Sequence, residues 1–202
     1  RGYTIVATDW SPAMVARTRE RAAAQGLADR ITAVTLGIHE LDELNAAPFD
    51  AIYSDLGPFN CVPDLDAAAQ SCARLLRPGG ALVISAIGRV CPWEIASFTL
   101  RGQLRRATVR FSHRAIPVGL NQRTVWTRYY TPRAFARHFA PAFALTTYRA
   151  LALAAPPPYF DGFAARHPRL TASLWRLDDR LGALPVLRDL GDHFLLVLTR
   201  RE

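Results

Sequence analysis

Short apolar runs alternate with amphipathic segments along the first ninety residues. Four runs rich in β-branched, aromatic or other apolar residues predict strands at 3–8, 31–36, 49–54 and 81–87. Residues 12–25 and 65–76 between them have the apolar spacing of helices. Strands separated by helices in this order predict an α/β protein with a Rossmann-like, doubly wound and mostly parallel sheet.

The pattern changes after Gly88. A helix is predicted over 93–104, two β-like runs over 107–130 around Gly119-Leu120-Asn121, and a short helix over 132–139. The remaining predictions are a strand at 143–153, a long amphipathic helix at 162–183 and a last strand at 193–199. A helix of that length between the final two strands leaves room for the last strand to run antiparallel.

Length and composition predict one globular domain over residues 1–202. No apolar run reaches the roughly 18 residues of a membrane span. The spacing of Cys61, Cys72 and Cys91 is unlike that of a zinc site, and their odd number favours a reduced, cytoplasmic protein. We find no metal-ligand constellation and no signal peptide, and the oligomeric state cannot be read from the chain.

The positive charge is concentrated in the middle of the chain. Residues 1–88 carry a net charge of −3, residues 89–149 carry +10 and residues 150–202 carry +1. All 25 basic residues are Arg, and Glu94 is the one acid of the middle segment. Such a field favours an anionic small molecule, a membrane surface or a nucleic acid as the partner.

Asp9 lies where a ligand-binding residue is expected in an α/β sheet. It ends the first predicted strand, and Ser11 and Pro12 behind it are typical of a helix N-terminus. Open α/β sheets bind ligands at the carboxyl ends of their strands, where an acid can accept hydrogen bonds from both hydroxyls of a ribose. The alternative is a loop Asp that caps the helix together with Ser11.

Three motifs in this order resemble class I S-adenosylmethionine-dependent methyltransferases of the type 11-like group. They are Asp9-Trp10-Ser11-Pro12-Ala13-Met14, Phe49-Asp50-Ala51-Ile52-Tyr53-Ser54-Asp55 and Leu75-Leu76-Arg77-Pro78-Gly79-Gly80-Ala81-Leu82. The segments at 57–65 and 190–197 resemble a subset of small bacterial members. One departure matters: the family's strand one and glycine-rich loop should precede the strand-two acid by about twenty residues. Only eight residues precede Asp9, so we expect a sequence truncated at its N-terminus that lacks strand one and the loop. We expect such a fragment to be unstable or to bind the cofactor weakly.

The resemblance implies S-adenosylmethionine as the cofactor. Asp9 would hold its ribose, Trp10 would cover one adenine face, and Gly37, Ile38 and His39 would contact the adenine. Residues 49–54 resemble the family's fourth strand, and Ser54 and Leu56 at its end would lie closest to the reactive methyl. Asp55 is the best-placed candidate for a general base, and its alternative is a carboxylate bonded to the backbone at the end of a strand.

The basic segment 89–131 is predicted to be a lid that selects the acceptor. The acceptor-contacting candidates are Asn60, Trp93, Arg128, Tyr129 and Tyr130. An aromatic, Arg-rich lid suits a planar or acidic small molecule. The alternative is that these aromatics form the insert's own small core and its arginines a solvated face.

Methyl transfer to a small-molecule acceptor is therefore the predicted function. A non-catalytic module that docks an acidic partner through its arginines is one alternative. A nicotinamide-dependent oxidoreductase is another, because Asp9 alone would serve either cofactor. Nucleic acid is disfavoured as the acceptor, since no Asn-Pro-Pro-aromatic tetrad follows residues 49–54.

Overall fold

A computed structural model describes residues 2–46, 48–120 and 123–202. The chain forms two compact units, Arg1–Ala46 and Ala47–Glu202, and each is described by itself. The single domain predicted over 1–202 remains a prediction. In the described residues no helix is long and apolar enough to cross a membrane, and no group of three or more His, Cys, Asp or Glu side chains could hold a metal ion.

The first unit is a β–α–β arrangement. Strands β1 (Ile5–Asp9) and β2 (Ile31–Thr35) pair in parallel, with Asp9 opposite Thr35, and α1 (Pro12–Ala24) connects them. The short helix η1 (Ile38–Glu43) follows β2. The carboxyl ends of the two strands therefore lie at one edge of the unit, as the sequence predicts.

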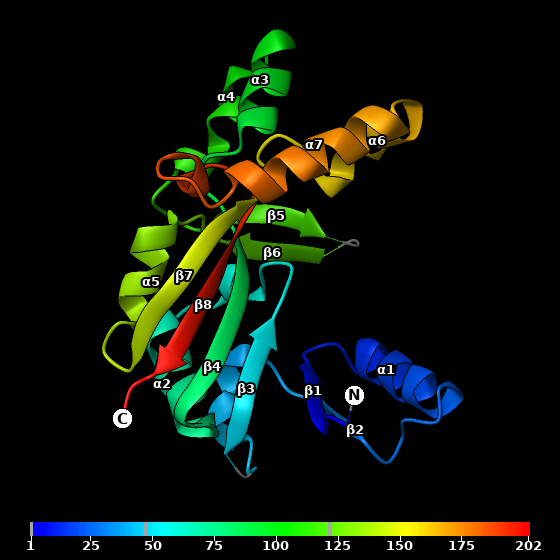
Figure 1. Cartoon of the computed structure of the whole chain (residues 1–202), viewed down its shortest axis with the longest axis vertical. Coiled ribbons are helices and arrows are strands. Elements are labelled where there is room, and N and C mark those ends of the chain that lie inside the picture. Colours follow the sequence, from blue (N-terminus) through cyan, green and yellow to red (C-terminus); the bar gives the residue numbers. More distant parts are fainter. Residues whose placement is uncertain (1, 47, 121–122) are drawn as a thin grey trace. The chain divides into compact units, whose positions relative to one another are not determined.

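The second unit is built on a four-stranded sheet in the order β3-β4-β8-β7 (Figure 1). The strands are β3 (Phe49–Ser54), β4 (Leu76–Ile87), β7 (Phe143–Leu151) and β8 (His193–Arg200). β3 and β4 are parallel, whereas β8 runs antiparallel to both of its neighbours. The antiparallel direction of the last strand is confirmed, and the chain is an α/β protein as predicted.

An aromatic core holds helices α2 (Leu65–Leu75) and α5 (Pro132–Phe139) against this sheet (Figure 1). Phe135 and Phe139 of α5 stack with their ring centroids 5.2 Å apart, and Phe59 and Phe194 meet Phe135 edge-on. All four side chains are essentially inaccessible to water. Burying aromatic rings of this size is the main stabilisation that such a core supplies.

Two predicted helices are shorter than expected. The helix predicted over 93–104 is two helices, α3 (Pro92–Leu100) and α4 (Leu104–Ala107), because Gly102 adopts a left-handed φ of +69° between them. The helix predicted over 162–183 is α6 (Asp161–Arg166) and α7 (Pro168–Leu181). Pro168 cannot continue the helix before it, since it lacks an amide donor, and it opens α7 instead.

Part of the β-like segment predicted over 107–130 forms an antiparallel hairpin of β5 (Ile116–Leu120) and β6 (Arg123–Thr127). The prediction is wrong for its first residues, because α4 ends at Ala107 and Val109–Phe111 form a 3-10 helix. The predicted turn at Gly119-Leu120-Asn121 falls partly outside the described residues. Short helical segments occupy the remaining connections: η2 (Pro58–Cys61), η3 (Val109–Phe111), η4 (Pro158–Phe160) and η5 (Leu187–Asp189).

Candidate functional site

In the first unit, Asp9 ends β1 with its carboxylate at the surface. The Ser11 amide donates to Asp9 Oδ1 at 2.7 Å, which fixes the carboxylate at the start of α1. The second oxygen, Oδ2, has no partner among the described residues. The indole of Trp10 beside it is 62% exposed. The geometry therefore fits both interpretations of Asp9, as a helix cap and as a ribose-binding acid. The side chain bonds to the start of the helix and still offers an acceptor oxygen.

Gly37, Ile38 and His39 lie beside this edge, at the carboxyl end of β2. Glu40 Oε2 accepts from the Gly37 amide at 2.7 Å and so closes the first turn of η1. A Cβ atom on Gly37 would lie 2.6 Å from the His39 ring, so the imidazole covers this glycine. The adenine-contact residues implied by the resemblance thus share one edge with Asp9 and Trp10.

In the second unit, Asp55 follows β3 and bonds to the neighbouring strand. Its Oδ1 accepts from the Ser85 hydroxyl at 2.5 Å and from the Leu56 amide at 2.8 Å. The hydrogen bond from Ser85 is the largest of the effects that lower the pKa of Asp55 below its usual range, and burial opposes them. A carboxylate with a lowered pKa is a weaker proton acceptor near neutral pH. These contacts favour the strand-end alternative for Asp55 over the general base.

The backbone after Asp55 turns sharply. Leu56 has a φ of +64° although it is not glycine, and its side chain is 76% exposed. Gly57 follows with a φ of +76°, and a Cβ there would lie 2.6 Å from Ile87 Cγ1. Bulky residues rarely adopt left-handed φ values, and such strain is concentrated at functional sites. Ser54, the remaining residue predicted here, pairs with Ile84 at the end of β3.

Asn60 is buried, and its amide group bonds only to backbone. Its Nδ2 donates to the carbonyls of Ile87 and Arg128, at 3.0 and 2.8 Å, and its Oδ1 accepts from the Ile87 amide at 2.8 Å. The side chain therefore joins the end of β4 to the residue after β6. With both amide protons donated to backbone, its oxygen accepting from a backbone amide and 1% of its surface exposed, Asn60 positions the backbone rather than an acceptor.

A buried polar cluster lies beyond the carboxyl end of β4. Arg110 Nη2 donates to Asp192 Oδ1 and Arg110 Nε donates to Glu94 Oε2, both at 2.6 Å. The Tyr159 hydroxyl joins them, at 2.7 Å from Glu94 Oε1 and 3.0 Å from Asp192 Oδ1. Arg110 also donates through Nη1 to the carbonyls of Gly88 and Asp192. We call Arg110, Glu94, Tyr159 and Asp192 the Arg110 cluster.

Burial and charge act in opposite directions in this cluster. Burial alone would raise the pKa of Asp192, but the hydrogen bond with His193 and the charge of Arg110 lower it to about 2. Burial raises the pKa of Tyr159, and the charge of Asp192 raises it further. Two carboxylates face one guanidinium here, which leaves an excess of negative charge beside His193.

His193 connects the cluster to the edge of the sheet. Its Nδ1 lies 2.7 Å from Asp192 Oδ2, and its side chain is 20% exposed. His193 pairs with Ile87 and Leu195 pairs with Ser85, so His193 and Ser85 project from the same face of the sheet. Gly191 makes this possible, since its φ of +136° turns the chain into β8 and a Cβ there would lie 2.7 Å from the Leu151 carbonyl.

The candidates in segment 89–131 have different surroundings. Tyr129 and Tyr130 are buried: Arg110 lies over the Tyr129 ring at 5.2 Å, and Tyr130 packs edge-on against Phe135. Arg128 is exposed, and the contacts found for it are backbone bonds with Asn60. Trp93 lines a cavity. Acceptor contacts by Tyr129 and Tyr130 are therefore unsupported, because both rings belong to the interior.

Sequence reasoning missed the Arg110 cluster and the role of His193. Arg110 is one of 25 arginines, and nothing near it in the sequence distinguishes it. The available signals were Glu94, the one acid in a strongly basic segment, and the pair Asp192-His193 next to Gly191. An isolated acid among arginines is a candidate for a buried ion pair, since buried charges occur in pairs.

Part of the chain is similar to known methyltransferases. Residues 1–80 match a family model described as a methyltransferase domain. Uncharacterized proteins of Mycobacterium tuberculosis and Mycobacterium bovis are 31% identical over 134 residues, which are 63% of this chain and 42% of each relative. The chain thus spans about two fifths of the length of these curated relatives.

Solved structures resemble nearly the whole chain. Geranyl diphosphate methyltransferase in complex with S-adenosylmethionine has a TM-score of 0.57 at 16% identity, over 98% of this chain and 69% of its own. N-methyltransferase NodS from Bradyrhizobium japonicum, in complex with S-adenosyl-L-homocysteine, has a TM-score of 0.52 at 13% identity, over 98% and 67%. The [4+2]-cyclase SpnF has a TM-score of 0.58 at 14% identity, over 100% and 67%.

The fold is that of class I S-adenosylmethionine-dependent methyltransferases, and the resemblance stated from the sequence is confirmed. The reaction is a separate question, because a [4+2]-cyclase shares this fold.

Proposed function

We propose that the protein transfers a methyl group from S-adenosylmethionine to a small-molecule acceptor that is planar or acidic. The observation that carries the proposal is the edge formed by Asp9, Trp10 and Gly37–His39, which lies within the residues 1–80 that match a methyltransferase domain. S-adenosylmethionine supplies a methyl group that is already activated, so the protein's task is mainly alignment.

The residues of the first unit fit this cofactor. Asp9 holds the ribose hydroxyls through the carboxylate oxygen that does not bond to Ser11. The exposed Trp10 ring covers an adenine face, and Ile38 and His39 contact the adenine. In the second unit, Ser54 and Leu56 remain the candidates for contact with the cofactor, and the strained turn there leaves the Leu56 side chain exposed.

Proton removal, where the acceptor requires it, falls to His193 rather than Asp55. Asp55 bonds to Ser85 and Leu56, and its lowered pKa makes it a poor base. His193 is held through Nδ1 by Asp192, which leaves Nε2 without a partner among the described residues. Imidazole is the side chain that most often serves as a general base near neutral pH.

The test is a calorimetric titration of S-adenosyl-L-homocysteine into the full-length protein, with NADH as the competing cofactor class. We expect the protein to bind S-adenosyl-L-homocysteine and not NADH. Asp9→Ala should weaken binding by tenfold or more, because hydrogen bonds to a charged group are lost. Asp29→Ala is the control, since Asp29 is an exposed acid of the same unit. A folded protein that binds NADH, or neither ligand, would refute the proposal and favour an oxidoreductase or a non-catalytic module.

A further inference from the structure

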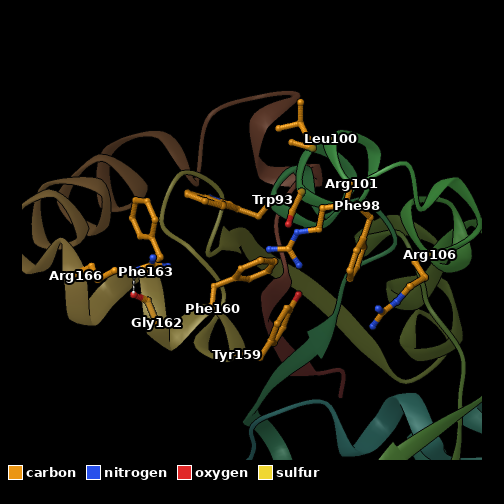
Figure 2. Close-up of a pocket in the computed structure, with 12 residues that line it drawn as sticks. Trp93, Phe98, Leu100, Arg101, Arg106, Tyr159, Phe160, Gly162, Phe163 and Arg166 are labelled. Atoms are coloured by element: carbon orange, nitrogen blue, oxygen red, sulfur yellow. Dashed lines mark hydrogen bonds between the residues drawn. The ribbon is translucent and has the colours of Figure 1, made fainter.

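The second unit contains a cavity of about 650 Å³ between α3 and the η4–α6 segment (Figure 2). This volume lies in the range of sites that hold small organic ligands. The cavity shares the carboxyl end of β4 with the Arg110 cluster, because α3 follows β4 after a short turn. Its lining consists of aromatic rings, small residues, Leu100 and three arginines.

One wall is a fixed group of aromatic rings. The Trp93 indole donates through Nε1 to the Ala154 carbonyl at 2.9 Å. Its ring packs against Phe163 and Phe160, with centroids 5.3 and 6.1 Å away. Asp178 of α7 accepts from the amides of residues 153–155 and so holds the loop that carries Ala154. A wall held in this way offers apolar area at little cost in side-chain entropy.

The other side is cationic. Arg101, Arg106 and Arg166 line the cavity, and none of them pairs with a described carboxylate. Arg106 lies over the Phe98 ring at 4.5 Å, and Arg166 donates to the Gly162 carbonyl. Figure 2 shows the Arg101 side chain directed toward the middle of the labelled residues. The nearest acid on α3, Glu94, already bonds to Arg110 and Tyr159.

We propose that this cavity binds the methyl acceptor, and that the acceptor is an amphipathic anion. Its apolar ring or chain lies against Trp93, Phe160 and Phe163. Its carboxylate or phosphate faces Arg101, Arg106 and Arg166, whose planar guanidinium groups suit either anion. The identification of the ligand as the acceptor rests on the proposed function, whereas its chemical class rests on the lining of the cavity alone.

Tyr159 joins this cavity to the edge of the sheet. Its ring lines the cavity, and its hydroxyl bonds to Glu94 and Asp192. Asp192 in turn bonds to His193, which shares a face of the sheet with Ser85, the partner of Asp55. A ligand that packs on the Tyr159 ring therefore contacts the same hydrogen-bonded group that positions His193.

The experiment uses two fluorescent probes of similar shape and different charge. The anionic probe is 8-anilinonaphthalene-1-sulfonate, and the neutral one is N-phenyl-1-naphthylamine. Both are titrated into the full-length protein, and into the double variant Arg101→Gln/Arg106→Gln. Arg105→Gln is the matched control, because Arg105 is an exposed arginine of α4 outside the cavity lining. Circular dichroism checks that each variant is folded.

We expect the double variant to weaken binding of the sulfonate by tenfold or more and to leave the neutral probe within twofold. Arg105→Gln should change neither. Phe163→Ala should weaken both probes, with Trp175→Ala of α7 as its control, since Trp175 is exposed and outside the lining. Equal loss with Arg105→Gln, or no selective loss of the sulfonate with the double variant, would overturn the proposal.

Displacement of the bound sulfonate then identifies the head group. The competitors are 1-naphthoate, 1-naphthyl phosphate and the uncharged 1-naphthalenemethanol. Stronger displacement by the carboxylate or by the phosphate supports an anion of that kind, whereas equal displacement by all three contradicts an anionic ligand. S-adenosyl-L-homocysteine is titrated into the same preparations. If the protein binds the anionic probe but not S-adenosyl-L-homocysteine, the anion site stands and the methyltransferase proposal is refuted. If it binds S-adenosyl-L-homocysteine but not the anionic probe, only the proposed anion site is refuted.

Discussion

Arg110 and Asp192 are 82 residues apart in the sequence, yet Nη2 of one lies 2.6 Å from Oδ1 of the other in the interior of the second unit. Neither side chain is more than 8% exposed. The pair fixes α3 and its following segments to the start of β8. The Asp192 carboxylate in turn accepts from the Tyr159 hydroxyl, whose ring lines the cavity, and bonds to His193.

Arg110→Met should destabilise the protein by roughly 3–5 kcal/mol, because it leaves buried carboxylates without their counter-charge. Arg77→Met is the matched control: the Arg77–Asp50 pair has a similar length, 2.7 Å, but both side chains are largely exposed. We expect that control to change the free energy of unfolding by less than about 1 kcal/mol. Urea denaturation followed by circular dichroism measures both, and similar losses in the two variants would contradict a buried pair.

Acid should weaken the second unit through Asp192. The pKa of this carboxyl is about 2 in the folded protein, against an ordinary value of 3.8. Its contribution, on the order of 2 kcal/mol, is therefore present above pH 4 and is lost as the pH falls toward 2. The measurement is the free energy of unfolding between pH 2 and 6. Asp192→Asn should flatten this slope, and an unchanged slope would show that other carboxyls produce it.

His193 should carry its proton on Nδ1 when the imidazole is neutral, because the Asp192 carboxylate accepts from that nitrogen. Nitrogen-15 NMR of the protein at pH 8 distinguishes the two tautomers. We expect a protonated Nδ1 and an unprotonated Nε2. Asp192→Asn should relax this preference, while Asp189→Asn, a change at an acid that bonds to Tyr148, should not. A proton found on Nε2 would argue against His193 as the base.

Leu56→Gly should stabilise the protein slightly or leave it unchanged, since glycine adopts the observed φ of +64° without strain. The same change should weaken binding of S-adenosyl-L-homocysteine, because the exposed side chain at the reactive end is lost. Gly57→Ala should lower the free energy of unfolding by more than about 1 kcal/mol, because of the positive φ and because a Cβ there would lie too close to Ile87. Thermal unfolding and calorimetry test both variants.

The sequence predicted most strands and the edge that carries Asp9, because periodicity and turn residues are local signals. It placed β3 and α5 with their observed bounds. It overlooked two local breaks, since Pro168 and Gly102 each interrupt a longer amphipathic pattern, and it failed where tertiary contacts decide. Tyr129 and Tyr130 have the composition of a ligand-binding lid, and their burial depends on Arg110 and Phe135, which no local pattern reveals.

The position of β8 between β4 and β7 has a consequence for biosynthesis. β8 follows every other strand of this sheet in the sequence, yet it is the strand that joins β4 to β7. While the ribosome is still making it, β4 and β7 each present an unpaired apolar edge, and Arg110 has no partner in Asp192. Such edges are prone to aggregate. We therefore expect nascent chains that stop before His193 to be held by chaperones, and the second unit to fold only after β8 has emerged.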